Sequence, residues 1–295
     1  MMKLFNYASI DVGSNSINLL LANVQNGEII SEETKSYITS LGEGLSDTGK
    51  FSNAGKDRAV EAFGEIKKII DNENIDPSNI VCVATEASRV ASNSDEFFQF
   101  IKKKFDIDTQ VISASEEARF TAKGAMPANS NESLLMDLGG ASTELIHFKD
   151  NEIKSFRSFK IGAVNIDPSF SWSGVEDFVK GTAYSERIVL VGGTAATVGA
   201  SYLKQRSFNS LPINVLELSV HDFITFHETI SKLEDGELLK EYPLMESRIN
   251  SIRNGIKRTL GILGKISPEV VSFSTKGVRH GALFNLVENV ETTDL

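Results

Sequence analysis

Cysteine is nearly absent from this chain, which has Cys82 as the single one among its 295 residues. One cysteine cannot form an internal disulfide, and its place in the apolar run 80–84 predicts a buried strand residue. Histidine is also scarce, and the four histidines show none of the spacings typical of a zinc site. These shortages exclude a disulfide framework, argue against zinc and fit a reducing cytoplasm.

Long apolar runs and positive charge are lacking too. No stretch approaches the roughly 18 apolar residues of a membrane span, and residues 1–6 lack the apolar core of a signal peptide. The 30 Lys and Arg residues are outnumbered by 40 Asp and Glu, which gives a net charge of −10. An acidic chain does not bind nucleic acid polymers or anionic membranes through its overall charge, although a local basic lane is compatible with it. We therefore expect a cytoplasmic protein without nucleic-acid or membrane partners.

The patterning of the chain favours two α/β domains. Hydrophobic residues make up 41% and charged residues 24% of the sequence, which is ordinary for a soluble globular protein, but 295 residues is long for one simple domain. The best boundary is 126–131, where Pro127 stands among polar residues. Apolar spacings predict helices over 52–74, 94–105, 113–125, around 164–181, 220–233, 245–266 and from 278 on, and strands over 80–85, 109–112, 187–191 and 270–273. Such alternation is typical of parallel pairing.

One motif occurs twice, as DVGSNS at 11–16 and DLGGAST at 137–143. In each copy an aspartate ends an apolar strand-like run, glycine and hydroxyl residues follow, and a second apolar run begins. A turn then precedes a third strand-like run, and the first of these turns, Asn26-Gly27, is a strong hairpin signal. Each copy therefore predicts a three-strand meander with its chemistry in the first turn.

The composition of the two turns predicts phosphate binding. Glycine lets backbone N–H groups face an anion, hydroxyls add donors, and an aspartate at a strand end can hold a hard cation such as Mg²⁺. One such motif is often only a tight turn, but two copies suggest two related domains with ligands between them. A third glycine turn, at 192–194, suits an anion at a helix start, although many α/β connections look alike. The residues predicted to hold phosphate are Asp11, Gly13, Ser14, Asn15, Ser16, Gly139, Gly140, Ala141, Ser142, Thr143, Gly192, Gly193 and Thr194.

A pair of glutamates after the strand at 109–112 contains a candidate catalytic residue. The spacing of Ser113 and Glu116 fits a capping box at a helix start. Glu117 points elsewhere on the helix, so it either faces solvent or holds the water that attacks a phosphorus atom.

Other charged residues near the turns are candidates for metal and phosphate binding. Asp137 and Glu144 flank the second turn, so a hairpin could bring both carboxylates to one Mg²⁺; alternatively, Glu144 is a polar residue alternating on a strand. Arg89 follows a strand end, where it would clamp phosphate or form a surface salt bridge.

Taken in order, these residues resemble the exopolyphosphatase and guanosine pentaphosphate phosphohydrolase (Ppx/GppA) family of the actin, Hsp70 and sugar-kinase superfamily. Besides the two turns, the matching stretches lie at 41–45, 84–93, 111–119, 162–164, 192–194 and 277–281. The resemblance implies an α/β fold of two actin-like (ribonuclease H-like) domains, 1–125 and 126–295, with the active site in the cleft between them. It leaves open that the last helix packs back on the first domain.

The resemblance also implies an activity: removal of the terminal phosphate from inorganic polyphosphate, from the 5′ end of guanosine pentaphosphate, or from both. By the family pattern, Glu117 positions the attacking water, Asp137 and Glu144 bind Mg²⁺ or another divalent cation, and Arg89 clamps phosphate. The family further implies a homodimer.

The sequence departs from the family pattern at two positions, and two other functions are compatible with it. Ala141 replaces the usual third glycine of the second turn, and Ala114 stands where glycine is common. Longer members continue into helical domains, so the sequence given predicts a preference for short polyphosphates or nucleotides, without ranking the two. Two alternatives stay open: an ATP-dependent kinase or ATPase with 192–194 cradling adenosine, and a non-catalytic sensor of polyphosphate or guanosine pentaphosphate.

Overall fold

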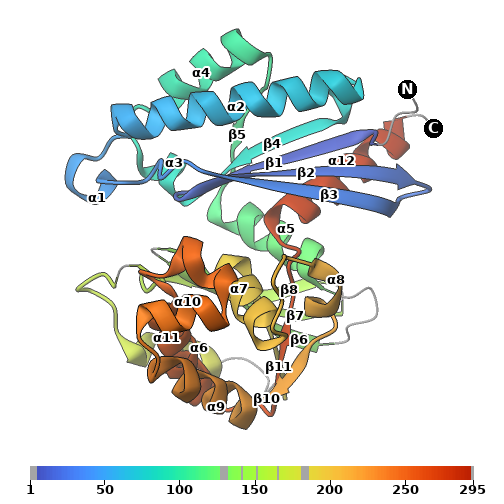
Figure 1. Cartoon of the computed structure of the whole chain (residues 1–295). Coiled ribbons are helices and arrows are strands. Elements are labelled where there is room, and N and C mark those ends of the chain that lie inside the picture. Colours follow the sequence, from blue (N-terminus) through green and yellow to red (C-terminus); the bar gives the residue numbers. More distant parts are fainter. Residues whose placement is uncertain are drawn as a thin grey trace. The chain divides into compact units, whose positions relative to one another are not determined.

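The structure, a computed structural model, describes residues 5–126, 132–140, 142–150, 152–164, 166–180 and 186–293. The chain divides into two units (Figure 1). The first unit takes in the chain up to Gly124 and the segment from Val278 on, and the second unit takes in the residues between. The predicted split into 1–125 and 126–295 therefore differs from this division in its last helix, which packs back on the first unit.

The first unit is built on a five-stranded sheet of order β3-β2-β1-β4-β5. The strands are β1 (Tyr7–Val12), β2 (Ser16–Gln25), β3 (Glu28–Ile38), β4 (Ile80–Ala84) and β5 (Gln110–Val111). β1, β2 and β3 form the predicted antiparallel meander, and β4 and β5 add in parallel. Asn26 and Gly27 both have positive φ, as a tight hairpin turn requires.

Helices cover both faces of this sheet. They are α1 (Leu45–Thr48), α2 (Asn53–Glu73), α3 (Glu86–Val90), α4 (Ser94–Phe105), α5 (Ala114–Ala125) and α12 (Val278–Thr293), with a 3-10 turn at Pro77–Asn79. Because side chains alternate along β1, Ile10 packs with Phe63 of α2 on one face, while Tyr7 packs toward Leu283 of α12 on the other. Ser52 caps α2, as the sequence predicts.

The second unit has a six-stranded sheet of order β10-β11-β9-β6-β7-β8. The strands are β6 (Glu132–Leu138), β7 (Thr143–Lys149), β8 (Glu152–Phe159), β9 (Arg187–Val191), β10 (Glu217–Ser219) and β11 (Val270–Phe273). The helices are α6 (Trp172–Lys180), α7 (Gly192–Tyr202), α8 (Ser210–Ile213), α9 (Val220–Ser231), α10 (Asp235–Glu241), a 3-10 helix η2 (Pro243–Arg248) and α11 (Ile252–Ile266). Their apolar faces share one core, which includes Phe223 and Phe273.

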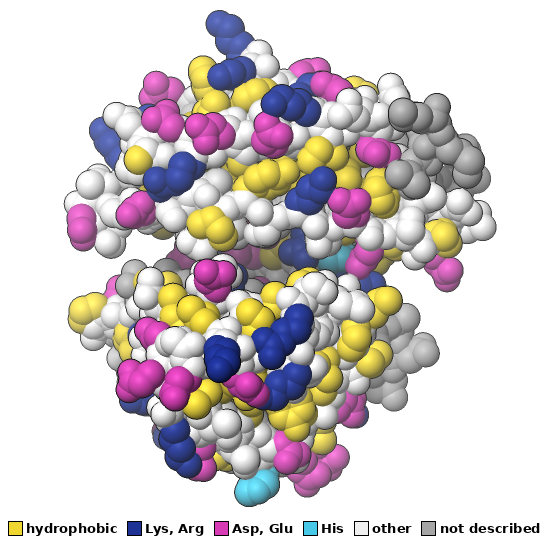
Figure 2. Space-filling model, in the orientation of Figure 1, with side chains coloured by type: hydrophobic (Ala, Val, Ile, Leu, Met, Phe, Trp, Pro, Cys, Tyr) yellow, Lys and Arg dark blue, Asp and Glu magenta, His cyan; other side chains and the backbone are white. Residues whose placement is uncertain are grey.

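The two units repeat one topology, as the duplicated motif predicts. In each, an antiparallel meander is followed by a strand that pairs in parallel with the meander's first strand, β4 with β1 and β9 with β6. The predicted single helix 245–266 is instead η2 followed by α11, and α10 and β10 have no counterpart in the sequence prediction. None of the described helices is both long and apolar enough to span a membrane. On the face seen in Figure 2, acidic and basic side chains are interspersed.

Candidate phosphate and metal site

The first glycine turn is held from behind by the segment that follows β3. The N–H of Gly13 donates to the carbonyl of Ser16 at 3.0 Å, and Gly42 donates to the carbonyl of Ser14 at 2.8 Å. A Cβ at Gly42 would lie 3.0 Å from the Ser14 Cβ, so glycine permits this close support. Within the described part of the chain, the N–H groups of Ser14 and Asn15 have no acceptor. Two available N–H groups on a fixed turn are suited to an anion.

The second glycine turn has the same geometry. Gly139 N–H donates to the carbonyl of Ser142 at 2.9 Å, and a Cβ at Gly139 would lie 3.3 Å from that oxygen, the same value as at Gly13. The segment 163–164 supports it from behind, because Ala163 and Val164 donate to the carbonyls of Gly139 and Gly140, each at 2.8 Å. Ala141, the predicted departure from the family pattern, lies outside the described residues.

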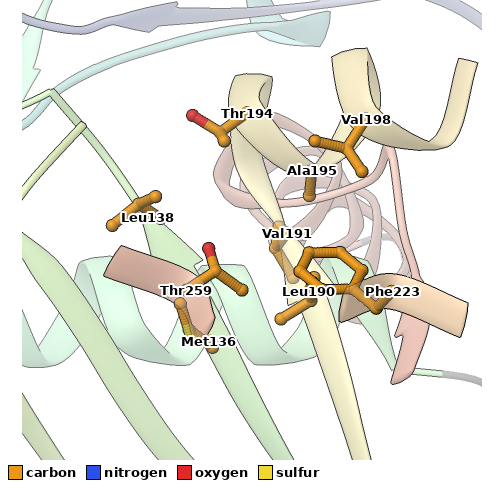
Figure 3. Close-up of a pocket in the computed structure, with 9 residues that line it drawn as sticks. All are labelled: Met136, Leu138, Leu190, Val191, Thr194, Ala195, Val198, Phe223 and Thr259. Atoms are coloured by element: carbon orange, nitrogen blue, oxygen red, sulfur yellow. The ribbon is translucent and has the colours of Figure 1, made fainter. Parts of the chain in front are cut away.

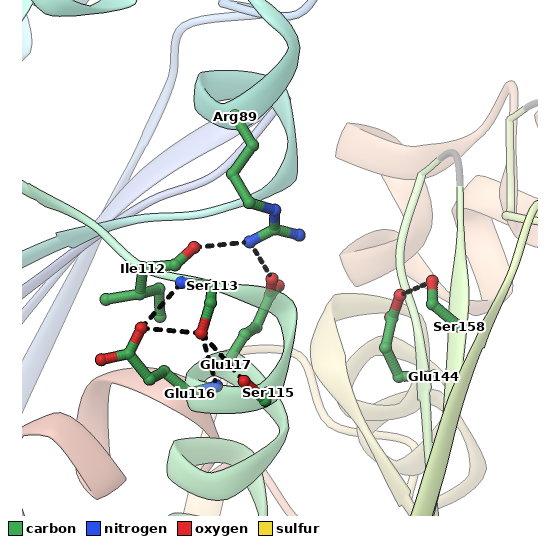
Figure 4. A network of polar contacts seen from close by, with 8 residues as sticks. All are labelled: Arg89, Ile112, Ser113, Ser115, Glu116, Glu117, Glu144 and Ser158. Atoms are coloured by element: carbon green, nitrogen blue, oxygen red, sulfur yellow. Dashed lines mark hydrogen bonds and ion pairs between the residues drawn. The ribbon is translucent and has the colours of Figure 1, made fainter.

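Asp137 and Glu144 are directly opposite each other across the β6–β7 pair. Directly opposed side chains share one face of a sheet with Cβ atoms about 5 Å apart. Ser158, opposite Glu144 on β8, donates to Glu144 Oε1 at 2.6 Å and orients that carboxylate (Figure 4). Two carboxylates on one face suit Mg²⁺, which retains several waters and needs few protein ligands. Within the described ranges no cluster of three or more His, Cys, Asp or Glu side chains forms a larger metal site.

The first unit has the matching positions with a different charge. Asp11 is opposite Asn18, which is opposite Ser36, and Ser36 donates to Asn18 Oδ1 at 2.8 Å. Asn18 thus occupies the place of Glu144, seven residues after the aspartate in both repeats. The acid pair needed for a divalent cation is therefore present only in the second repeat, as the predicted assignment to Asp137 and Glu144 requires.

The third glycine turn lies against Asp137. Gly192 has φ +87°, and a Cβ there would lie 2.5 Å from Asp137 Oδ1, so only glycine fits. Gly193 lies against Arg248 of η2, whose guanidinium a Cβ at that position would overlap. Burial lowers the pKa of Arg248, and its side chain has no hydrogen bond or ion pair within the described residues. A half-buried cation with no acidic partner among the described residues, at the start of α7, is suited to an anionic ligand.

Arg248 was missed by the sequence prediction, which placed it inside one long helix. Serines flank it at 247 and 251, but residues 241–251 contain no glycine. The two adjacent glycines at 192–193 were the available hint, because they allow a side chain from elsewhere to approach the helix start.

A small cavity lies beneath this turn and is not a ligand site (Figure 3). It has a volume of about 10 Å³ between β6, β9, α7, α9 and α11, which is room for about one water molecule and far below the size of a ligand pocket. Its walls are apolar except for two threonine hydroxyls, and that of Thr259 already donates to the carbonyl of Gly255 at 3.0 Å. The cavity is a packing defect in the core of the second unit.

Glu117 and Arg89 meet within the first unit. Arg89 Nη1 lies 2.8 Å from Glu117 Oε2 and also donates to the carbonyl of Ile112 at 2.9 Å (Figure 4). Both side chains are largely shielded, with 27% and 19% exposed. The Nε and Nη2 groups of Arg89 have no acceptor among the described residues. The guanidinium can therefore orient the Glu117 carboxylate and still donate to a phosphate.

The neighbouring Glu116 has the structural role that the sequence predicts. Ser113 donates to Glu116 Oε2 through its N–H at 2.9 Å and its hydroxyl at 2.7 Å, and Glu116 N–H donates back to Ser113 Oγ at 3.2 Å. These hydrogen bonds hold the pKa of Glu116 below its ordinary value. The capping box is confirmed: Glu116 caps the helix, whereas the adjacent Glu117 pairs with Arg89.

Comparison with known proteins identifies the family. The model of the Ppx/GppA phosphatase family matches residues 20–290. The chain belongs to this family. A Ppx/GppA phosphatase of Aquifex aeolicus has a solved structure with 26% sequence identity and a TM-score of 0.77, covering 95% of this chain and 98% of its own. The two-unit α/β fold predicted from the sequence is thus confirmed as that of Ppx/GppA structures.

Two curated relatives of this Ppx/GppA chain are longer proteins. The guanosine-5′-triphosphate,3′-diphosphate pyrophosphatase of Vibrio parahaemolyticus is 25% identical over 98% of this chain and 61% of its own length. The bifunctional 3-dehydroquinate synthase/phosphatase of Fusobacterium nucleatum is 34% identical over 55% of this chain and 26% of its own length. The chain therefore spans only part of the relatives it matches.

The predicted site residues of this Ppx/GppA protein fall into two groups. The first unit holds the first glycine turn with Glu117 and Arg89, and the second unit holds the other two turns with Asp137, Glu144 and the additional Arg248. Within each unit the structure brings the members together on adjoining elements.

Proposed function

We propose that this Ppx/GppA protein is a phosphohydrolase that releases orthophosphate from the end of inorganic polyphosphate, from the 5′ end of guanosine pentaphosphate, or from both. The observation that carries the proposal is the Glu117 carboxylate 2.8 Å from Arg89. Hydrolysis needs a base that orients water, and a shielded carboxylate fixed by a guanidinium meets that need. A kinase would use such a base on an acceptor hydroxyl rather than on water, and a protein that only binds its ligand has no use for one.

In the proposed reaction Glu117 accepts a hydrogen bond from water and takes its proton. The water oxygen bonds to the terminal phosphorus in line with the bridging oxygen, whose bond to that phosphorus breaks. Arg89 donates from Nε and Nη2 to the phosphoryl oxygens, and the N–H groups of Ser14 and Asn15 donate to the same group. These donors oppose the negative charge that develops on the oxygens.

The residues of the second unit are proposed to hold the rest of the phosphate chain. Asp137 and Glu144 would hold a divalent cation, which would supply positive charge for phosphate oxygens. Arg248, at the start of α7, donates to a further phosphate, and the N-terminal end of that helix favours negative charge. The proposal thus requires groups of both units to act on one substrate.

The alternatives differ from this proposal in their products. An ATP-dependent kinase transfers phosphate to an acceptor, an ATPase acts on ATP rather than polyphosphate, and a sensor binds without turnover. The names of the relatives do not decide the substrate, because the Vibrio protein is named for a guanosine nucleotide and the match covers 61% of it. The proposed homodimer has its own test, the mass of the protein by light scattering.

The deciding experiment measures orthophosphate released from polyphosphate, guanosine pentaphosphate and ATP by the wild type and by Glu117→Gln. We expect the variant to lose about 10²–10⁴-fold in kcat, the usual contribution of a general base, while substrate binding persists. Glu116→Gln is the matched control, since it removes the adjacent carboxylate and weakens only the capping box. If Glu117→Gln releases phosphate at the wild-type rate, Glu117 has no part in the mechanism.

A further inference from the structure

The first turn of α12 places two basic side chains against the polar end of the first sheet. Ser9 and Asp11 alternate onto the face of β1 that α12 covers, and Ser9 Oγ donates to the carbonyl of Arg279 at 2.7 Å. The next residue, His280, is 1% exposed, and its Nε2 lies 3.3 Å from Glu32 Oε2 of β3. The helix is thus fixed to the sheet through its backbone and through its side chains.

Arg279 and Asp11 form the electrostatic centre of this arrangement. Burial lowers the pKa of Arg279, whereas the charges of Asp11 and Glu32 raise it. In turn, burial raises the pKa of Asp11, and Arg279 and the hydrogen bond from Asn18 lower it. A cation in the first turn of a helix is disfavoured by the helix dipole. Arg279 is therefore stable there because it faces these carboxylates.

Two contacts with α5 fix the position of α12. A Cβ at Gly281 would overlap the backbone of Phe120 on α5, so the two helices touch with no side chain between them. Arg119 Nη1 also donates to Asn285 Oδ1 at 3.0 Å, one helical turn further along α12. The side chain of Arg279 is thus presented to β1 by a backbone that is held on two sides.

We propose that Arg279 is a positioning residue that acts as the permanent counter-ion of Asp11 and so fixes the strand end that carries the first glycine turn. The second repeat has Glu144 where the first has Asn18, and its acid pair is the one suited to an exchangeable cation. The first repeat instead receives its positive charge from the protein. This inference rests on the proposed function for its kinetic consequences, but the electrostatic interaction of Arg279 with Asp11 does not depend on that function.

The kinetic consequence concerns phosphate binding. The turn at 13–16 offers N–H groups to an anion directly after Asp11, and an uncompensated carboxylate there would repel that anion. Arg279→Met is therefore expected to raise KM for polyphosphate by tenfold or more, with a smaller effect on kcat. Arg279→Lys retains the charge and should restore most of the affinity.

The pH profile gives a second readout. Arg279 of α12 and Asn18 of β2 act on Asp11, and the charge of Asp11 also acts on the Cys82 thiol of β4. Glu32 of β3 acts on Arg279, and its Oε2 lies 3.3 Å from Nε2 of His280. Without Arg279 the pKa of Asp11 rises, and protonation of Asp11 removes the charge that repels the phosphate, so the deficit in kcat/KM of Arg279→Met relative to the wild type should shrink as the pH falls. Arg119→Gln is the matched control, because the arginine that it removes donates to Asn285 Oδ1 of α12 rather than to a carboxylate, and its kcat/KM relative to the wild type should not change with pH.

A double-mutant cycle separates this inference from the proposed function. The midpoint of thermal unfolding, measured without substrate, is compared for Asp11→Asn, Arg279→Met and the double variant. We expect Arg279→Met alone to lower the midpoint most, and the double variant to recover part of the loss because both charges are gone. If the two effects simply add, or if Arg279→Met leaves the midpoint unchanged, Arg279 is not the counter-ion of Asp11, whatever activity the protein has.

Discussion

Replacing Gly192 with alanine tests whether the Asp137 carboxylate depends on the backbone beside it. Alanine at φ +87° costs about 1–2 kcal/mol of stability, since L-residues with a Cβ disfavour that region. The new Cβ would lie 2.5 Å from Asp137 Oδ1, so the carboxylate must move by roughly 1 Å to reach ordinary van der Waals contact. A displacement of about 1 Å at a catalytic group typically costs on the order of 10²-fold in rate.

The assay measures orthophosphate release against Mg²⁺ concentration, together with unfolding in urea. We expect Gly192→Ala to lower kcat/KM by about 100-fold, the typical cost of such a displacement, and to need more Mg²⁺ for half-maximal rate. Gly49→Ala is the matched control, because Gly49 has φ +64° with no atom within 4 Å of a Cβ, so it incurs the backbone cost without the overlap. If the two variants have the same kinetics, the reasoning about Asp137 is refuted.

Two further predictions concern Arg248 and Glu116. Arg248→Met should raise KM for polyphosphate by about 10-fold or more, since a charged hydrogen bond contributes ~1.5–3 kcal/mol. The urea midpoint should stay level or rise, because no protein partner is lost. Arg253→Met breaks a hydrogen bond to Asp235 and should instead lower the urea midpoint without raising KM. The pKa of Glu116 is lowered in the folded state, so its contribution to stability is present above its ordinary pKa of 4.5 and is lost as the pH falls through the lower folded value. The urea midpoints of wild type and Glu116→Gln should therefore differ at pH 7 and converge in acid; a constant difference would contradict this.

The features predictable from sequence were those set by neighbouring residues. The two glycine turns, the Asn26-Gly27 hairpin and the Ser113–Glu116 capping box each depend on fewer than ten consecutive residues, and the structure has all of them. The difference between the two repeats was also present in the sequence, because the seventh residue after each aspartate is Asn18 in one and Glu144 in the other. Aligning the repeats with each other would have shown it.

The features that the sequence did not reveal depend on distant contacts. Arg248 matters because η2 brings it to Gly193, 55 positions earlier in the sequence. The pairing of Arg279 with Asp11 joins residues at opposite ends of the chain, and no local pattern specifies that α12 returns to β1. Likewise, the Glu117–Arg89 ion pair requires β4 and β5 to lie side by side, which depends on the register of the sheet.

The return of α12 to the first unit has a consequence for the order in which the protein can fold during synthesis. The second unit is complete in sequence once Gly277 has been made, whereas the first unit, whose strands are made before those of the second, lacks a helix until α12 has been made. Until then, one face of β1 and β2, including Leu20 and Ala22, has no cover. The unit begun first is thus the unit finished last, and the exposed face of its sheet is the part of the nascent chain most in need of protection from aggregation.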